Sequence, residues 1–122
     1  MIQIIRIEYY TGDGLFRAED ILGFSIINNL KCHDELCSKH KRFPTAYKEF
    51  KDDLTSEHYC AFKSLKQLGY WIKKEWIAEI ISIGFKIYLI DIEEEHCLIG
   101  TRQIAFKKEN IISKKDISQL FN

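Results

Sequence analysis

The fold is decided by the stretch Phe85-Lys86-Ile87-Tyr88-Leu89-Ile90, in which one lysine interrupts an otherwise apolar and aromatic run. A run of this kind is typical of a strand at the centre of a sheet. Gly84 precedes it, at the position where a glycine commonly follows the end of a helix. Upstream of this glycine, apolar residues recur at helical spacing and predict two helices. These residues are Leu65, Leu68 and Ile72, after the N-cap residue Ser64, and then Trp76, Ile77, Ile80 and Ile81.

Shorter elements are predicted on both sides of this centre. Runs of β-branched and aromatic residues indicate strands, and clusters of Gly and Asp indicate turns. Strands are predicted at residues 2–10, 59–62, 97–99 and 103–106, turns at 11–14 and 91–95, and helices at 21–30, 46–54 and 116–121. We therefore predict an α+β fold in which a small mixed or antiparallel sheet packs against helices, as a single domain over residues 1–122.

Composition excludes several classes of protein. Hydrophobic residues make up 46% of the chain, which is too many for a disordered protein. Eighteen Lys and Arg residues balance eighteen Asp and Glu residues, whereas a general nucleic-acid coat would be strongly basic. No secretory signal and no membrane-spanning stretch is recognisable, so we expect a cytoplasmic protein without a membrane partner. The four cysteines are then expected to be reduced, buried thiols.

Potential metal ligands gather at Cys32, His33, Cys37 and His40. Cysteine and histidine are ligands that zinc prefers, and a structural zinc site is tetrahedral. The Cys-x4-Cys-x2-His spacing is not that of a common zinc knuckle, however, and no second knuckle of matching spacing follows. We therefore predict no metal, and interpret these residues as unrelated thiols and imidazoles. Cys32, Cys37 and His40 are the candidate ligands of the alternative, a zinc site.

Arg6 is a cation within the apolar first strand, between Ile5 and Ile7. Because successive side chains of a strand alternate between its faces, we expect Arg6 to face away from both isoleucines, toward a cleft or solvent. Two interpretations stay open. A strand-borne arginine can clamp a phosphate or carboxylate through two N–H groups. Alternatively, Arg6 faces solvent and pairs with Glu8.

A second candidate site is the loop patch, which we define as Lys41, Arg42, Phe43 and Tyr47. It lies in the least regular segment, residues 31–56. Basic residues interleaved with aromatic ones can stack bases or hold phosphates, and loops often carry binding residues. Acidic residues in the same segment dilute its charge, so a mixed-charge surface loop is the alternative interpretation.

Several segments carry a family resemblance, among them Ile5-Arg6-Ile7-Glu8, Cys60-Ala61-Phe62-Lys63-Ser64-Leu65-Lys66-Gln67-Leu68 and Gly100-Thr101-Arg102-Gln103-Ile104-Ala105-Phe106. They resemble the segments Tyr-Arg-Val-Glu, Cys-Gly-Phe-Lys-Ser-Leu-Glu-Gln-Leu and Gly-x-x-Gln-Val-x-Phe of a group of small phage and prophage proteins. Residues 12–17, 42–47 and 84–88 add to the resemblance. The chain departs from that pattern at Ile5, Leu15 and Phe43, where the group has tyrosine, proline and histidine.

The layout is also distantly similar to an ADP-ribosyltransferase fold. In that fold an arginine on an early strand holds the phosphates of NAD, and a glutamate on a late strand orients the ribose. The resemblance gives these roles to Arg6 and Gln103, with Tyr9 or Tyr10 stacking the nicotinamide. Glutamine does not stabilise a developing positive charge as a carboxylate does, which weakens the case for transfer activity.

From the phage resemblance we predict an accessory protein that binds and inhibits a host factor, for example an inhibitor of host defence of the anti-CRISPR-like kind. Its binding residues would be Arg6, Tyr9, Tyr10 and the loop patch, and its partner a host protein or protein–nucleic-acid complex. Homo-oligomerisation stays open, and no cofactor is predicted. The alternatives are an NAD-dependent transferase or nucleotide-binding protein, and a structural or virion-associated phage protein. The sequence does not decide whether the chain is an enzyme, and a binding role is favoured.

Overall fold

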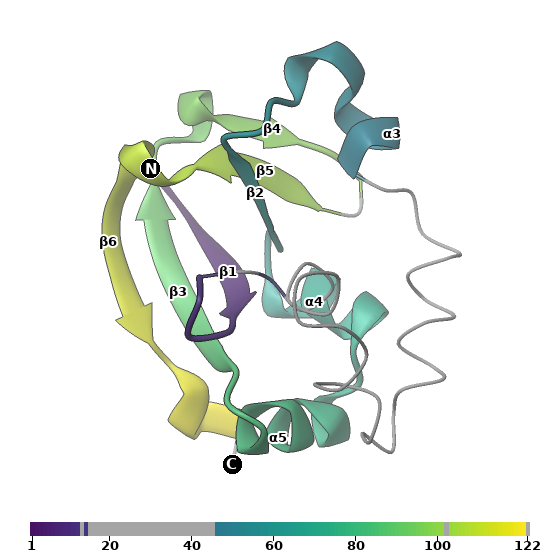
Figure 1. Ribbon diagram of the computed structural model, residues 1–122, viewed down its shortest axis with the longest axis vertical. Coiled ribbons are helices and arrows are strands. Elements are labelled where there is room, and N and C mark those ends of the chain that lie inside the picture. Colours follow the sequence, from purple (N-terminus) through teal and green to yellow (C-terminus); the bar gives the residue numbers. More distant parts are fainter. Residues whose placement is uncertain (13, 15–45, 102, 122) are drawn as a thin grey trace.

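A computed structural model describes residues 1–12, 14, 46–101 and 103–121 of the chain (Figure 1). The α-helices and strands follow one another as β1 (Ile2–Glu8), α3 (Ala46–Phe50), β2 (His58–Ala61), α4 (Leu65–Trp71), α5 (Lys74–Ser82), β3 (Lys86–Ile92), β4 (Cys97–Ile99), β5 (Ile104–Lys107) and β6 (Ile111–Asp116). Short 3₁₀ turns lie at Lys51–Asp53, Glu94–His96, Lys108–Asn110 and Ser118–Phe121. The strands form two antiparallel three-stranded sheets, which confirms the predicted α+β class.

The first sheet has the strand order β1-β3-β6, so the apolar strand that was predicted to be central does lie in the middle. One face of this sheet packs against α4 and α5. Ile5, Ile7 and Ile87 from the sheet meet Leu68 and Ile80 from the helices in what we call the helix-side cluster. The spacing of apolar residues along α4 and α5 is helical because it keeps one stripe of each helix against this face.

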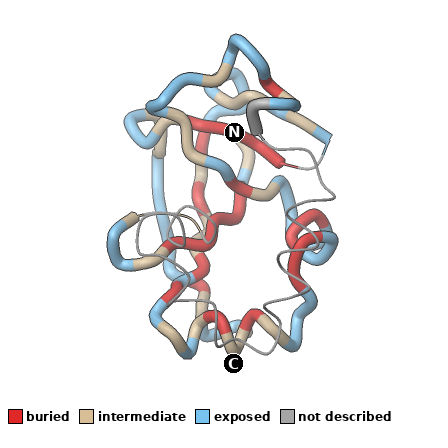
Figure 2. Tube along the Cα trace, turned by 45° about the vertical axis from the view of Figure 1, so that its right-hand side comes forward, coloured by how far each residue is buried: buried red, intermediate tan, exposed pale blue. Residues whose placement is uncertain are grey.

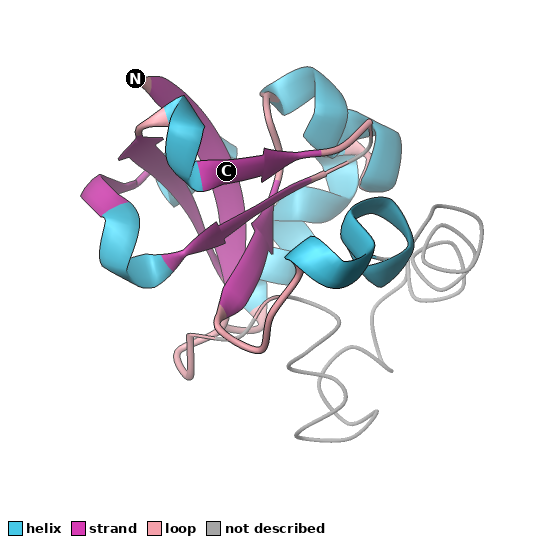
Figure 3. Ribbon diagram, turned by 90° about the horizontal axis from the view of Figure 1, so that it is seen from above, coloured by secondary structure: helices cyan, strands magenta, loops and turns pink. Residues whose placement is uncertain are grey.

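The second sheet has the order β2-β5-β4 and covers the opposite face of the first. Ile4 and Ile90 from the first sheet meet Ile104 and Phe106 from β5 in the sheet-side cluster. The two sheets are also joined through their backbones, because Ile5 and Phe62 exchange hydrogen bonds of 2.8 and 2.7 Å. Figure 2 marks the buried positions along the chain, and Figure 3 shows the strands of both sheets grouped together.

Several local predictions are confirmed. Ser64 caps α4, since its hydroxyl accepts a 3.1 Å hydrogen bond from the Gln67 amide. Gly84 follows α5 with a φ of +111°, the left-handed conformation expected of a glycine after a helix. Trp71 is buried in the helix-side cluster, and Trp76 packs against it. The 3.6-residue period therefore identified the core residues Leu68, Ile72, Ile77 and Ile80, whereas Leu65 of the predicted stripe is 56% exposed.

Other boundaries differ from the predictions. The chain leaves β1 after Glu8 and turns through residues 9–12, so Tyr9 and Tyr10 lie outside the strand. Asp91 is part of β3 and not of an acidic turn, and the predicted terminal helix is a 3₁₀ turn at Ser118–Phe121. The lysine-rich tail contains β6, which was not predicted. It pairs with β3 but is almost entirely exposed, so it lacks the alternating apolar pattern that marks a half-buried strand.

The predicted helix at residues 21–30 lies outside the described residues, as does Asp13 of the predicted turn at 11–14. None of the described helices is long and apolar enough to cross a membrane.

Candidate functional site

The candidate site is built around Arg6, whose side chain leaves β1 on the face covered by the second sheet. Its guanidinium carbon lies 5.0 Å from the centre of the Tyr59 ring and 6.0 Å from that of Phe106. Only 3% of the residue is exposed. Arg6 does face away from Ile5 and Ile7, but the expectation that it points to a cleft or solvent is wrong, because β2 and β5 cover it.

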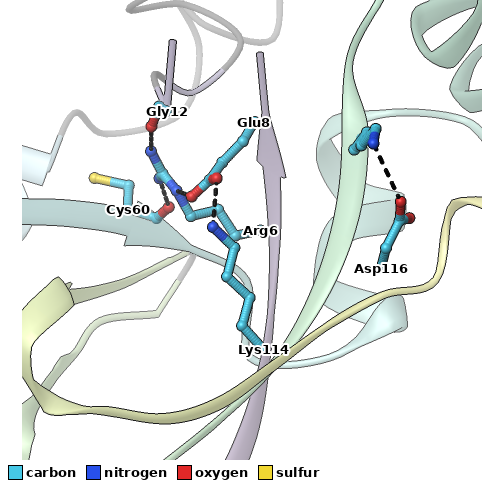
Figure 4. Close-up of polar contacts among 7 residues, drawn as sticks. Arg6, Glu8, Gly12, Cys60, Lys114 and Asp116 are labelled. Atoms are coloured by element: carbon cyan, nitrogen blue, oxygen red, sulfur yellow. Dashed lines mark hydrogen bonds and ion pairs between the residues drawn. The ribbon is translucent and has the colours of Figure 1, made fainter. Parts of the chain in front are cut away.

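The guanidinium has three hydrogen-bond acceptors among the described residues (Figure 4). Nε donates to Oε2 of Glu8 over 2.8 Å, and the two Nη groups donate to the backbone carbonyls of Cys60 and, over 3.0 Å, Gly12. Arg6 therefore ties together β1, β2 and the turn that follows β1. Pairing with Glu8 was one of the two predicted interpretations, although both residues are buried and not solvent-facing.

Glu8 also accepts a 2.7 Å hydrogen bond from Nζ of Lys114 on β6. Burial raises the pKa of this carboxyl, but hydrogen bonds from Lys114 and Arg6, with their positive charges, outweigh burial and lower the pKa below 4.5. Glu8 is thus a carboxylate shared by two cations. We call Arg6, Glu8 and Lys114 the Arg6 network; its formal charges leave one positive charge in excess.

The turn after β1 is joined to this network by hydrogen bonds. The amide of Gly12 donates a 2.8 Å hydrogen bond to the carbonyl of Tyr9, and the carbonyl of Gly12 accepts from Arg6. Gly12 has a φ of +87°, which a glycine adopts without steric cost. The turn displays Tyr10, which is 82% exposed. Arg6 therefore acts here as a clamp that positions an exposed tyrosine.

Tyr9 and Tyr10 have different surroundings. The Tyr9 ring lies 4.9 Å from the ring of Phe85 and packs against the helix-side cluster, on the opposite face of the first sheet from Arg6. The Tyr10 ring lies tilted against that of Tyr9, with 4.7 Å between ring centres, and Tyr10 is 82% exposed. Of the two tyrosines that the sequence put forward, Tyr10 is the exposed one.

Lys108 lies beside this turn, although the sequence did not single it out. Its Nζ is 4.3 Å from the centre of the Tyr59 ring, within cation–π range. A Cβ added to Gly12 would lie 2.8 Å from the same Nζ, so the lysine and the turn are in close contact. Lys108 is exposed, and it forms no ion pair with any residue in the described part of the chain. We call Tyr10, Gly12, Tyr59 and Lys108 the turn surface.

Gln103 is buried at the start of β5, where its carbonyl accepts a 2.9 Å hydrogen bond from the amide of Gly100. This short turn is bound to α4, because Nε2 of Gln67 donates to the carbonyl of Thr101 over 3.2 Å. It is also bound to α3, since Thr101 donates to Glu49 over 3.1 Å. Two segments that carry the family resemblance, 60–68 and 100–106, therefore meet in space and hold helices to the second sheet.

The remaining candidates are mostly not described. Lys41, Arg42, Phe43, Cys32, Cys37 and His40 lie outside the described residues. Tyr47 belongs to α3. Among the residues that the structure does describe, no three His, Cys, Asp or Glu side chains gather as a metal site would require. Cys60 is exposed and Cys97 half-buried, which corrects the expectation of buried thiols for these two described cysteines.

Sequence reasoning singled out Arg6 and Tyr10 as candidates, but it did not single out Tyr59, Lys108 or Lys114, which lie near them in the structure. Lys114 meets Glu8 across 106 positions of sequence, and Arg6 meets Cys60 across 54. A local sequence pattern gives no information about contacts between residues so far apart in the chain. The one available signal was the alternation of β1, which puts Arg6 and Glu8 on the same face as Ile4 and so toward any layer that covers it.

The comparison with protein families gives one match. The family model described as "Bacteriophage T4 Y00F protein" matches residues 1–119, nearly the whole chain. This match confirms the predicted resemblance to small phage proteins. No curated protein matches the chain, and no solved structure does.

Proposed function

The chain belongs to the bacteriophage T4 Y00F protein family, and from this premise we propose that it is an accessory protein that binds and inhibits a host factor. The proposed target is a host defence protein, or a complex of protein and nucleic acid in the host cytoplasm. The observation that supports binding is the 9–12 turn, which displays Tyr10 at 82% exposure on a backbone fixed by Arg6.

Such a turn suits a binding role for two physical reasons. Tyrosine is among the residues that contribute most to protein interfaces, because a large, rigid ring brings both apolar area and a hydroxyl. A turn that is already ordered loses little conformational freedom when a partner docks, so more of the contact energy remains as affinity. The hydrogen bond from Arg6 to the Gly12 carbonyl ties the turn to β1 without any partner present.

The test is capture of the partner from a lysate of the bacterial host with the full-length chain. We expect a stoichiometric host protein to be retained, and its activity to fall when the purified chain is added. Tyr10→Ala should weaken capture about tenfold or more, the effect of removing an interface anchor. Tyr70→Ala is the control, because Tyr70 is an exposed tyrosine on α4 and is not part of the turn surface.

Circular dichroism should show that both variants fold like the parent chain. The proposal fails if no stoichiometric partner is retained. It also fails if a partner is retained but keeps its full activity.

The NAD alternative rests on Arg6 and Gln103. A pyrophosphate at Arg6 would have to displace Glu8 or one of the two backbone carbonyls, and Tyr9 packs on the other face of the sheet. Calorimetric titration with NAD separates this alternative from the binding role: binding that is lost in Arg6→Ala would favour it. A structural or virion-associated role would instead show as expression late in infection, together with the capsid proteins.

A further inference from the structure

We propose that the turn surface, formed by Tyr10, Gly12, Tyr59 and Lys108, receives a carboxylate-bearing segment of a protein partner. This inference rests on the proposed binding function and names the chemistry of the partner. Lys108 would pair with the carboxylate, and Tyr10 would cover the apolar part of the same segment.

The first step of the argument is the local charge. Three cations, Arg6, Lys108 and Lys114, lie around the rings of Tyr59 and Tyr88, whereas the Arg6 network holds a single carboxylate, Glu8. Arg6 and Lys114 share that carboxylate, so the positive charge of Lys108 is not balanced within this group. An incoming anion would find it already positioned by the Tyr59 ring.

The second step is the environment of the Lys108 ammonium. Its Nζ lies over the Tyr59 ring at 4.3 Å and against the backbone of Gly12, so part of its hydration shell is replaced by protein. A cation that is partly desolvated and held in place forms a stronger ion pair than a mobile surface lysine, because less water is displaced and less freedom is lost on pairing. The residue is nevertheless exposed and accessible to a partner.

The third step favours a protein over a nucleic acid. A polyanion needs several cations along its path, and binding rises with each phosphate that is neutralised. The neighbouring Lys107 is already paired with Glu57 at 3.6 Å, so it gives a phosphate backbone no second unpaired cation beside Lys108. One lysine next to Gly12, two positions along the turn from the exposed Tyr10, suits a carboxylate within an apolar or mixed protein segment.

The closing experiment is an NMR titration of the isotope-labelled full-length chain with two probes: a short peptide of glutamate residues and a single-stranded oligothymidylate. We expect the peptide to shift the amide signals of Gly12 and Lys108, and the shifts to disappear in Lys108→Glu. Lys115→Glu is the matched control, since it makes the same charge change on an exposed lysine of β6. It should leave the shifts unchanged.

The inference is overturned if the peptide leaves Gly12 and Lys108 unshifted, or if the oligonucleotide shifts them more strongly than the peptide does. Loss of the shifts in Lys115→Glu as well would also overturn it, because a general charge effect would then explain them. None of these results bears on whether a host partner is captured, so the proposed function and this inference can fail separately. For a captured partner, Lys108→Glu should weaken binding about tenfold or more, and Lys115→Glu less than twofold.

Discussion

Arg6 shows why the identity of a single buried residue matters to the whole surface. Its three acceptors, the Glu8 carboxylate and the carbonyls of Cys60 and Gly12, lie in three directions around one planar group. A guanidinium offers donors in a fixed fork, whereas a lysine ammonium is a point charge on a flexible stem. Arginine can therefore order β1, β2 and the 9–12 turn at once, and lysine cannot.

Replacing Glu8 tests the energy of this arrangement. In Glu8→Gln, the buried Arg6 and the exposed Lys114 keep their charges and lose their shared counter-ion. We expect the free energy of unfolding to fall by about 3 kcal/mol, the usual cost of breaking a buried ion pair from one side. Urea denaturation measures this. Glu57→Gln, which breaks the surface pair with Lys107, should change stability by less than about 1 kcal/mol.

A second prediction concerns pH. The pKa of Glu8 is lowered in the folded protein from its ordinary value of 4.5, so the unfolded chain binds its proton first as pH falls. The stability that Glu8 contributes is therefore fully present above pH 4.5 and is lost progressively below it. Asp116 also has a lowered pKa, through hydrogen bonds from Ser118. The parent chain and Glu8→Gln will therefore both lose some stability in acid.

The contribution of Glu8 is the difference between the parent chain and Glu8→Gln, measured by urea denaturation at a series of pH values. This difference should shrink as pH falls through and below 4.5. A difference that stays constant down to pH 3 would mean that the charge of Glu8 does not carry the effect.

At the scale of elements, one glycine after a helix and one inside a helix give a matched pair of tests. Gly84 follows α5 at a φ of +111°, and an added Cβ would lie 3.1 Å from the Tyr9 ring. Gly69 lies inside α4, and a Cβ there would have no atom within 4 Å. We expect Gly84→Ala to lower the free energy of unfolding by about 1–2 kcal/mol. Gly69→Ala should raise it by up to about 1 kcal/mol, and the opposite signs in thermal unfolding check the assigned conformations.

Gln67 gives the other prediction at this scale. Its side chain accepts a 2.7 Å hydrogen bond from the amide of Lys63 and donates to the carbonyl of Thr101. Gln67→Ala removes both bonds at a buried position, so we expect a loss of about 2 kcal/mol in unfolding free energy. Hydrogen exchange should also accelerate at the Gly100 amide, since the turn at 100–103 loses its link to α4. Unchanged exchange there would contradict the proposed link.

The sequence predicted well those elements in which the pattern of apolar and polar residues follows the burial of each position. The apolar run of β3 is buried between two layers, and the stripe of α5 packs on one of them. β6 was not predicted because it is an edge strand with exposed lysines. Such a composition protects a sheet edge from further pairing, but it does not give the apolar pattern by which a strand is recognised in the sequence. The turn surface was not predicted for another reason. Lys108 and Tyr59 are brought together only by the packing of β2, β5 and the 9–12 turn.

At the scale of the whole molecule, β1 and β3 join the two hydrophobic clusters. Successive side chains of β1, such as Ile4 and Ile5, enter opposite clusters, and Ile87 and Ile90 of β3 do the same. A strand cannot lose its packing on one face and keep its register on the other, because the same backbone hydrogen bonds serve both. The two clusters should therefore form and melt together.

Ile104→Ala tests this coupling. Ile104 is fully buried in the sheet-side cluster, so truncation should lower the free energy of unfolding by about 3 kcal/mol. Trp71 lies in the helix-side cluster and reports unfolding there through its fluorescence. If the described sheets and helices unfold as one unit, the fluorescence transition of Ile104→Ala should move to lower urea by the same amount as the transition in circular dichroism. A fluorescence midpoint that stays at its original position would show that the helix-side cluster survives alone, and that β1 and β3 do not couple the two faces.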